Sequence, residues 1–507
     1  MDTKALRQKI LDLAIRGKLV PQDPNDEPAE VLLERIREQK QQMLKEGKLK
    51  KKDIKNDTII FKGEDNLHYE KFQDGTVKCI EDEIPFEVPD GWKWCRLPAI
   101  TIDIFAGGDK PDSYEKNPTD ICNIPIYSNG IENNGLYGFT NKPRVIEPSI
   151  TISARGTIGF CCIRETPFVP IVRLITITPS KEFELYYLKT VFEALIETGE
   201  GSSIPQLTVP RIKPKLIPVP PVNEQIRIQN KLHEILNSIA VISREKEELQ
   251  QLLQTIKSKI LDLAIRGKLV LQNPDDEPAS VLLERIRIEK EELIKQGKIK
   301  RDKKESVIFR GDDNSYYEKI GDDIESIDAE IPFNLPDSWI WCRGYSCFSG
   351  MESTKPQGEF FDYIDIDSID NRSHCVKKTK HIPVIEAPSR ASRAINSGSV
   401  LFSLVRPYLE NIALIEEIHS HSIASTGFYV CNSNGLLLPE YMFYLMISKY
   451  VVDGLNQYMK GDNSPSISKN DIENWLYPIP PIAEQKRICY ILKSTYAIIE
   501  KLEESLI

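Results

Sequence analysis

The chain carries the same long segment twice, half its length apart. Residues 10–20 read ILDLAIRGKLV, and residues 260–270 repeat that string. Between 9–40 and 259–290, roughly 26 of 32 aligned positions are identical, which indicates a true internal duplication. A period of about half the chain excludes a solenoid of short repeats and favours two similar halves in one polypeptide. Two such halves can form a pseudo-symmetric object, which suits a target that also has two halves.

Further repeated motifs follow in the same order in both halves. They are PxDEPAxVLLERIR at 24–37 and 274–287, FKGEDN at 61–66 and FRGDDN at 309–314, EIPFEVPDGWKWCR at 83–96 and EIPFNLPDSWIWCR at 330–343, and PVPPVNEQIRI at 218–228 and PIPPIAEQKRI at 478–488. Between the last two motifs of each half the similarity disappears. Each half is therefore predicted to be a diverged insert held in a shared frame. The predicted segments are 1–96, 97–217, 218–343, 344–477 and 478–507.

Length and hydropathy indicate a multidomain chain without membrane spans. The length of 507 residues suggests three or four domains. No apolar run reaches membrane-spanning length, and the N-terminal MDTKALRQKI has no apolar signal core. We expect a cytoplasmic protein with no membrane partner.

The ten cysteines are predicted to be reduced and structural. None lies in a CxxC pair, and the adjacent Cys161 and Cys162 suit neither a normal disulfide nor a shared zinc ion. Cys95 and Cys342 recur in the WKWCR and WIWCR contexts. These two are expected to be small core residues.

The charge distribution leaves two interpretations open. A net charge of -10 does not by itself favour a nucleic-acid partner. Each half nevertheless contains a basic run: Lys45, Lys48, Lys50, Lys51, Lys52 and Lys55, and then Lys295, Lys298, Lys300, Arg301, Lys303 and Lys304. Such runs are either solvated, flexible segments or strips that contact phosphates.

The frames are predicted to be helical. Asp26-Glu27-Pro28 and Asp276-Glu277-Pro278 each open a helix with acids and a first-turn proline. After PPVNEQ, apolar residues recur at steps of four and three, with Lys246 at the one polar position. This heptad pattern predicts a long coiled-coil helix over about 219–266. The seam comprises Ile228, Leu232, Ile235, Ile239, Ile242, Leu249, Leu253, Ile256, Ile260 and Leu263.

A second seam is predicted from the two ends of the chain. Its C-terminal part comprises Ile488, Leu492, Thr495, Ile499, Leu502 and Leu506. Leu6, Ile10 and Leu13 match Ile256, Ile260 and Leu263. We expect the N-terminal helix to complete the C-terminal one, so that the two halves close in a ring with one chain break. A circular permutant joining Ile507 to Met1 through a short helical linker should then fold.

The inserts are predicted to be related mixed folds. Residues 150–163 and 399–415 are β-branched runs interrupted by Gly or Pro, as in strands. Residues 182–195 and 438–451 are typical of amphipathic helices. Each helix precedes a Gly/Ser/Pro loop: GSSIPQL at 201–207 and GDNSPSI at 461–467. One scaffold with two diverged surfaces is the pattern expected for two different binding specificities.

No catalytic constellation is present in the sequence. The GxxxxGK[ST] phosphate loop, GxGxxG, the NPPY or DPPY tetrapeptide, GxSxG and HExxH are all missing. His419 and His421 lie near Cys431, but exposed loop histidines are expected there rather than a metal site. The adjacent Glu416 and Glu417 would face opposite ways on a strand, which disfavours paired acid–base work.

The ordered, duplicated motifs resemble the specificity subunit of type I restriction-modification systems. The resemblance extends over essentially the whole chain, with LDLAIRGKLV, EIPFxxPDxWxWCR, a diverged insert and PxPPxxEQxRI in the family's order. It implies an α+β fold in which two globular target-recognition domains are separated by two long antiparallel coiled-coil helices, with a pseudo-twofold axis. The recognition domains map onto the two inserts. The family helices map onto about 219–266 and onto 479–507 together with the N-terminal helix.

The resemblance also implies a function and partners. Each recognition domain would read one half of an asymmetric, bipartite site in double-stranded DNA, and the helices would set the unread spacer. This non-catalytic chain would bind two modification (methyltransferase) subunits and restriction (endonuclease/translocase) subunits, directing adenine methylation and restriction against phage DNA. It would bind no cofactor itself, with S-adenosylmethionine, ATP and magnesium expected on the partners.

Base-reading candidates follow from side-chain chemistry, because Arg and amide groups are the usual readers of base edges. In the first insert the candidates are Lys110, Asn129, Asn133, Asn134, Lys142, Arg144 and Arg155. In the second insert they are Lys355, Arg372, Lys377, Lys378, Arg390, Arg393 and Arg406. The alternative for each is a solvated cation or a turn-forming Asn, as in Asn133-Asn134-Gly135.

Two other classes of protein remain as alternatives. One is a coiled-coil assembly adaptor that does not read DNA, which the diverged inserts disfavour. The other is a self-contained nuclease or methyltransferase, which the missing motifs disfavour. Activity of the purified chain with cofactor but no partner would favour the enzyme, whereas specific DNA retention by the partner complex alone would favour the specificity subunit.

Overall fold

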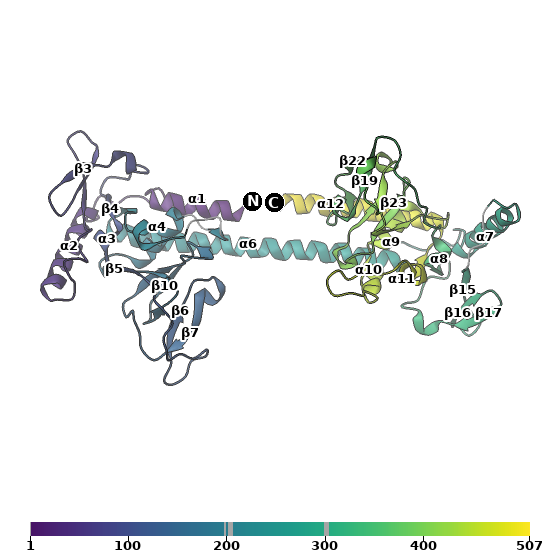
Figure 1. Ribbon diagram of the computed structural model, residues 1–507, viewed down its shortest axis with the longest axis horizontal. Coiled ribbons are helices and arrows are strands. Elements are labelled where there is room, and N and C mark those ends of the chain that lie inside the picture. The colour runs from purple at the N-terminus through teal and green to yellow at the C-terminus, as the bar shows by residue number, and fades with distance from the viewer. Residues whose placement is uncertain (1, 197–198, 201–205, 299–303, 507) are drawn as a thin grey trace. The chain divides into compact units, whose positions relative to one another are not determined.

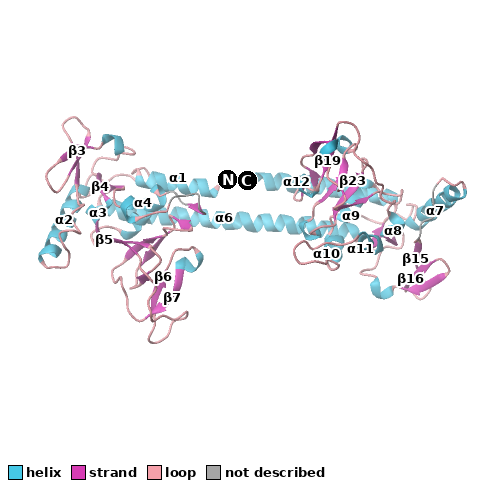
Figure 2. Cartoon of the chain, viewed as in Figure 1, coloured by secondary structure: helices cyan, strands magenta, loops and turns pink. Residues whose placement is uncertain are grey.

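The computed structural model describes residues 2–196, 199–200, 206–298 and 304–506. The chain divides into two compact units, Met1–Lys246 and Glu247–Ile507. Both combine helices with strands (Figures 1 and 2), as the predicted α+β class requires. Among the described residues, no helix is long and apolar enough to cross a membrane.

The frame of the first unit contains helices and two small sheets. Its helices are α1 (Thr3–Ile15), α2 (Ala29–Lys45) and the first part of α6 (Val222–Ile265). A three-stranded antiparallel meander consists of β1 (Ile59–Lys62), β2 (His68–Lys71) and β3 (Val77–Cys79). Strand β4 (Lys93–Arg96) pairs antiparallel with β14 (Leu216–Val219), so Cys95 lies opposite Ile217. This pair joins the two ends of the insert, because one strand precedes it and the other follows it.

The first insert is built on two sheets. One sheet has the order β10 (Cys161–Arg164), β8 (Ser149–Ile152), β12 (Ile175–Pro179) and β5 (Thr101–Ala106). The other has the order β11 (Val169–Pro170), β6 (Ile124–Tyr127) and β7 (Leu136–Thr140). The remaining elements are the pair β9 (Thr157–Ile158) with β13 (Gly199–Glu200), and helices α3 (Leu97–Ile100), α4 (Leu185–Leu195) and α5 (Val209–Ile212).

The frame of the second unit repeats the first, element by element. Its helices are the last part of α6, α7 (Ala279–Lys295) and α12 (Ile482–Ser505). Its meander consists of β15 (Ser306–Arg310), β16 (Tyr316–Ile320) and β17 (Asp323–Ser326). Strands β18 (Ile340–Arg343) and β28 (Leu476–Ile479) close the base of the second insert.

The second insert again has two principal sheets. One has the order β22 (Lys380–Pro383), β19 (Phe360–Ile364), β26 (Ile423–Ser425) and β23 (Ala391–Ala394). The other has the order β25 (Ile412–Leu414), β24 (Val400–Ser403) and β27 (Phe428–Cys431). The other elements are β20 (Ile369–Asp370), β21 (Cys375–Val376), α8 (Gly344–Cys347), α9 (Pro439–Met446), α10 (Lys449–Asn456) and α11 (Lys469–Asn474).

In each unit a shorter helix lies antiparallel to α6. In the first unit the end of α1, at Leu11 and Ile15, shares a core with Ile228 and Leu232, while the positive charge of Lys246 acts on Asp2 at the other end of α1. In the second unit Lys257 forms an ion pair of 2.9 Å with Glu503. Leu261, farther along α6, shares a core with Ile488 and Leu492, which lie earlier in α12.

The predicted seam is buried only in part. Ile228, Leu232, Ile239, Leu253, Ile488, Leu492 and Ile499 are buried, whereas Ile242, Leu249, Ile256 and Leu502 are exposed, and Ile235, Ile260, Leu263 and Leu506 are intermediate. Beyond Leu253 the buried residues of α6 are Leu261, Ala264 and Ile265. Their spacing follows the 3.6-residue turn of the helix rather than the predicted seven-residue pattern. An α-helix of 3.6 residues per turn drifts about 20° per heptad away from a strict 3.5-residue repeat.

Three local differences from the predictions have physical reasons. The frames are helical only in part, because the β-branched NDTIIF and ESVIF segments enter the meanders. Pro28 and Pro278 occupy the position just before their helices rather than the first turn. The helix predicted over 438–451 is two helices, because the Ser448 side chain accepts from the Val451 amide and starts α10 anew.

Cys95 and Cys342 are buried, which confirms their predicted place in the core.

Candidate nucleic-acid interface

The EQxR motif joins the two parts of each frame through a buried carboxylate. Glu224, at the start of α6, is 1% exposed. It accepts hydrogen bonds from Trp92 Nε1 at 2.9 Å and from Gln22 Nε2 at 2.7 Å. Burial raises the pKa of Glu224, and both donors oppose that shift. The second unit repeats the arrangement with Glu484, Trp339 and Gln272.

The two other polar residues of the motif also make equivalent contacts in both units. The Gln225 side chain donates to Pro220 O and accepts from the Glu184 amide, next to α4 of the insert. Arg227 pairs with Asp26 at 2.5 Å, and this hydrogen bond lowers the pKa of Asp26. Their counterparts are Gln485, which contacts Pro480, Leu436 and Leu438, and Arg487, which pairs with Asp276. The repeated motifs therefore fix the orientation of each insert on its frame.

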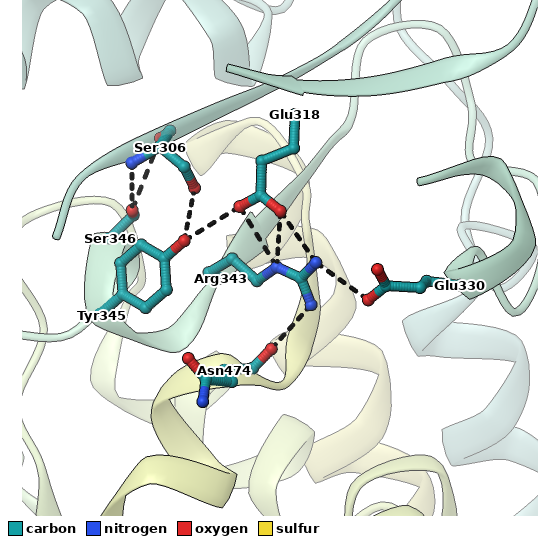
Figure 3. Close-up of polar contacts among 7 residues, drawn as sticks. All are labelled: Ser306, Glu318, Glu330, Arg343, Tyr345, Ser346 and Asn474. Atoms are coloured by element: carbon teal, nitrogen blue, oxygen red, sulfur yellow. Dashed lines mark hydrogen bonds and ion pairs between the residues drawn. The ribbon is translucent and has the colours of Figure 1, made fainter. Parts of the chain in front are cut away.

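A second network, repeated in both units, ties the meander to the base of the insert. Figure 3 shows Arg343 of β18 between the carboxylates of Glu318 and Glu330, with its remaining donor on the Asn474 carbonyl. The Tyr345 hydroxyl donates to Glu318 at 2.9 Å and accepts from the Ser306 hydroxyl at 3.0 Å. Desolvation of Glu318 would raise its pKa, but the hydrogen bonds from Arg343, Ser306 and Tyr345 and the positive charge of Arg343 together outweigh it, and the pKa is lowered. The first unit repeats the network with Arg96, Glu70, Glu83 and Pro214.

The loops of the first insert meet in a hydrogen-bonded group that we call loop cluster 1, comprising 128–135, 153–156, 171–173 and 206–207. Asn129 is central to it, because its amide oxygen accepts from Ala154 N at 2.7 Å and its amide nitrogen donates to Val172 O at 2.7 Å. Leu207 N donates to Ala154 O. The cluster contains four non-glycine residues with left-handed backbone: Asn133, Asn134, Val172 and Arg173. Such strained conformations gather at binding sites held by the surrounding structure.

The second insert has a corresponding loop cluster 2, comprising 371–374, 404–411 and 463–467. Arg406 N donates to Pro465 O at 2.7 Å, and its Nη2 donates to Asn463 O at 3.0 Å. Ile467 N donates to Leu404 O, as Leu207 N does to Ala154 O in the first insert. Here the non-glycine residues with left-handed backbone are His374, Arg406 and Glu410. The same scaffold thus presents two clusters that differ in sequence.

Four of the seven candidates in the first insert lie in loop cluster 1: Asn129, Asn133, Asn134 and Arg155. Arg155 is exposed and contacts Gln206. Arg144 borders the cluster, since its guanidinium lies 4.6 Å from the Phe105 ring centre and close to Gly108, which accepts from Val172 N. Lys110 and Lys142 are exposed, and Lys110 Nζ lies 4.1 Å from the centre of the Tyr114 ring. Among the described residues, no hydrogen bond, ion pair or ring contact joins either lysine to the cluster.

The candidates of the second insert fall into two groups. Arg372 and Arg406 lie in loop cluster 2, and the exposed Lys377 and Lys378 follow directly after strand β21. Lys355, Arg390 and Arg393 gather around strand β23, where Ser353 bridges to Arg393 and Thr354 N donates to Ser392 O. Lys355 and Arg390 are exposed, whereas Arg393 is half-buried.

Several residues of the loop clusters were not among the base-reading candidates predicted from the sequence. Arg173 is exposed in a left-handed turn, but PIVRLI reads as an uninterrupted strand. Tyr408 in loop cluster 2 is 46% exposed. Gln206 belongs to the GSSIPQL loop that the sequence did mark, although 201–205 of that loop lie outside the described residues.

Outside the inserts, the basic runs offer further cations. Lys45, Lys48, Lys50, Lys51, Lys52 and Lys55 are exposed, and Lys48 pairs with Glu46 at 2.8 Å. In the second run, Lys300, Arg301 and Lys303 lie outside the described residues. No group of three or more His, Cys, Asp or Glu side chains that could hold a metal ion gathers in the described part of the chain.

Comparisons with known proteins agree on one family. The model of the type I restriction modification DNA specificity domain matches residues 91–251 and 353–507. The EcoAI type I restriction enzyme specificity subunit of Escherichia coli is 29% identical, over 96% of this chain and 87% of its own length. The EcoEI specificity subunit of the same organism is 25% identical, over 99% and 90%. A solved structure, the HsdS subunit from Thermoanaerobacter tengcongensis, is 36% identical over 34% of this chain and 45% of that chain, with a TM-score of 0.32.

Proposed function

This chain belongs to the type I restriction modification DNA specificity family, and from that premise we propose how it selects its target. Each insert reads one half of an asymmetric, bipartite site in double-stranded DNA. The observation that carries this proposal is the presence of two corresponding loop clusters, different in sequence, on two copies of one frame. Because the two frames have the same structure, they present their loops in the same way. Because the loops differ in sequence, they recognise different half-sites.

The helices beside α6 are proposed to set the length of the unread spacer. Two readers related by a pseudo-twofold axis would approach the duplex as dimeric readers approach palindromes, about 34–36 Å apart along it. The 44 residues of α6 span roughly 66 Å at 1.5 Å per residue. The antiparallel packing of α1 and α12 against α6 supports a coiled-coil ruler.

The ruler is tested by inserting four helical residues after Leu249. The insertion adds about 6 Å, close to two base pairs at about 3.4 Å each. Methylated sites sequenced from cells that contain the variant and its modification subunit should keep both half-sites and change the spacer. An unchanged spacer would refute the ruler while leaving the half-site readers standing.

The partners are proposed to be two modification subunits, together with restriction subunits where the system has them. Apolar side chains that stay exposed on the helices fit this role: Leu249, Leu252, Ile256, Ile491, Ile498 and Leu502 are 37–60% exposed. Exposed apolar side chains mark a protein-binding surface where they form a contiguous patch. S-adenosylmethionine, ATP and magnesium would be bound by those partners, and this chain would supply recognition without catalysis.

The decisive experiment compares DNA retention by the purified chain, by the modification subunit and by their complex. Sequence-specific retention and adenine methylation by the complex alone support the proposal. Assembly without any sequence preference would favour the adaptor that does not read DNA. Methylation or cleavage by this chain with cofactor and no partner would show that it is an enzyme itself.

A further inference from the structure

Loop 128–135 of the first insert is a hairpin loop with two consecutive left-handed asparagines. It connects β6 to β7, and Ser128 N closes it by donating to Gly135 O at 2.8 Å. Within it, Asn133 and Asn134 both have left-handed backbone, with φ of 46° and 53°. Asparagine is among the few non-glycine residues that tolerate this conformation.

The two consecutive asparagines present their side chains to solvent. Both are exposed, and neither side-chain amide forms a hydrogen bond with another described residue. Asn129, four residues earlier, differs because both ends of its amide are occupied by Ala154 and Val172. The Asn129 amide therefore holds the loop in place, whereas the amides of Asn133 and Asn134 are available for hydrogen bonds to a ligand.

A buried cation lies beneath this turn. The Arg164 residue of β10 is 7% exposed, and no ion pair joins it to a carboxylate among the described residues. Its Nη2 donates to Asn134 O at 2.6 Å, its Nε donates to Thr151 Oγ1 at 3.0 Å, and its guanidinium lies 3.5 Å from the Tyr127 ring centre. Tyr127 ends strand β6 at the start of the loop.

Burying an unpaired guanidinium is costly, so the position requires an explanation. Desolvation lowers the pKa of Arg164. In the second insert, the corresponding short strand β25 has the apolar sequence Ile412–Leu414 and no arginine. An apolar side chain would suffice here if the residue only filled the core. The guanidinium does more, because it donates a hydrogen bond to a backbone carbonyl of the left-handed turn.

We propose that Asn133 and Asn134 read base edges in the half-site of the first insert, with Arg164 as the positioning residue that holds their turn in place. An Asn amide offers one donor and one acceptor, which match N7 and N6 of adenine in the major groove. The reading turn is thus preformed and recognises at least one adenine. This inference rests on the proposed function and assigns part of its specificity to three residues.

The test uses a double variant that removes the amides and keeps the backbone. Asn133→Gly/Asn134→Gly preserves left-handed conformations, which glycine adopts freely. Asn66→Gly is the matched control, since Asn66 also has left-handed backbone, at φ 63°, but lies in the frame meander. Each variant is combined with the modification subunit, methylated sites are sequenced, and binding to duplexes with single base-pair changes is measured.

The double variant should lose preference at one or two adjacent positions of a single half-site. The loss should be about 5- to 150-fold, the range of one bidentate base contact. Arg164→Leu should relax the same positions although both asparagines remain, and Arg164→Lys should restore part of the preference. Asn66→Gly should leave both half-sites unchanged.

Each contrary outcome has a distinct meaning. Unchanged preference in the double variant overturns the reading role of the asparagines. An Arg164→Leu variant that lowers methylation equally at every position, or that changes nothing, overturns the positioning role. A wild-type complex without any sequence preference would instead defeat the proposed function as a whole.

Discussion

Removing Arg343 tests whether the buried network of Figure 3 stabilises the second unit. The side chains of Arg343 and Glu318 are 12% and 7% exposed, and they are joined by contacts of 2.8 to 3.3 Å. Arg343→Leu leaves the Glu318 carboxylate buried with neutral hydroxyl groups in place of the guanidinium. Breaking a buried pair on one side costs about 3–5 kcal/mol. Because Tyr345 remains, we expect about 3 kcal/mol, at the lower end of that range.

The double variant Arg343→Leu/Glu318→Leu separates the charge effect from simple loss of packing. With both charges removed, no uncompensated carboxylate remains, and the main loss is the hydrogen bond to Asn474 O. That bond is worth about 1 kcal/mol. The double variant should therefore be about 2 kcal/mol more stable than the single one.

Urea unfolding gives the free energies, and hydrogen exchange of backbone amides assigns them to a unit. Exchange should accelerate in β16, β18 and β28 for Arg343→Leu. The matched variant Arg96→Leu should instead accelerate exchange in β2, β4 and β14, where Arg96 holds Glu70. A cost below about 1 kcal/mol for Arg343→Leu, or a double variant less stable than the single one, would refute the reasoning.

The same network has a defined dependence on pH. Because the folded pKa of Glu318 is lowered, the pair stabilises the fold fully above the ordinary glutamate pKa of about 4.3. This stability is lost as the pH falls through the lowered value. Urea midpoints measured from pH 7 downward should therefore converge for wild type and the double variant in acid. A constant difference between them would contradict the assignment.

Two further substitutions test close contacts. Gly267→Ala should cost about 1–3 kcal/mol, because a Cβ at φ +68° would lie 2.5 Å from a proline ring. Gly297→Ala, at the same φ but with nothing within 4 Å, should cost only the conformational part, about 1 kcal/mol, and equal costs in urea unfolding would refute the packing argument. Trp339→Phe removes a donor to the buried Glu484 and should cost about 1–3 kcal/mol beyond the change in volume. Trp475→Phe is its control, since that indole nitrogen has no partner among the described residues; equal melting temperatures of the two variants would contradict the prediction.

The duplicated frame could be predicted because its signals are local or repeated. Heptad spacing predicted a helix over about 219–266, and α6 spans Val222–Ile265. The strands near 150–163 and 399–415 were also recognised from their β-branched runs. Glu224 and Glu484 were visible as part of a repeated motif. Their role was not, because the contact of Glu224 with Trp92 joins residues 132 positions apart.

The interface was harder to predict because it depends on backbone conformation and burial. Asn129 and Asn133 are the same residue type in one loop, yet one amide is occupied by the backbone and the other is exposed. Arg164 follows the strand-like CCI and gave no sign of being a buried cation. The left-handed turn at Val172 and Arg173 contradicts the usual preference of a β-branched residue. Only the fold distinguishes these cases.

The contact between Arg227 and Asp26 spans 201 positions of sequence, and this separation constrains the order of events during synthesis. A ribosome adding 5–20 residues per second needs roughly 10–40 s to make that stretch. For most of that time α1 and α2 exist without the start of α6, which supplies Glu224 and Arg227. The insert is therefore translated before its own frame can close. A nascent first unit is exposed to proteases and chaperones until residue 227 emerges, and the second unit repeats the same wait before residue 487.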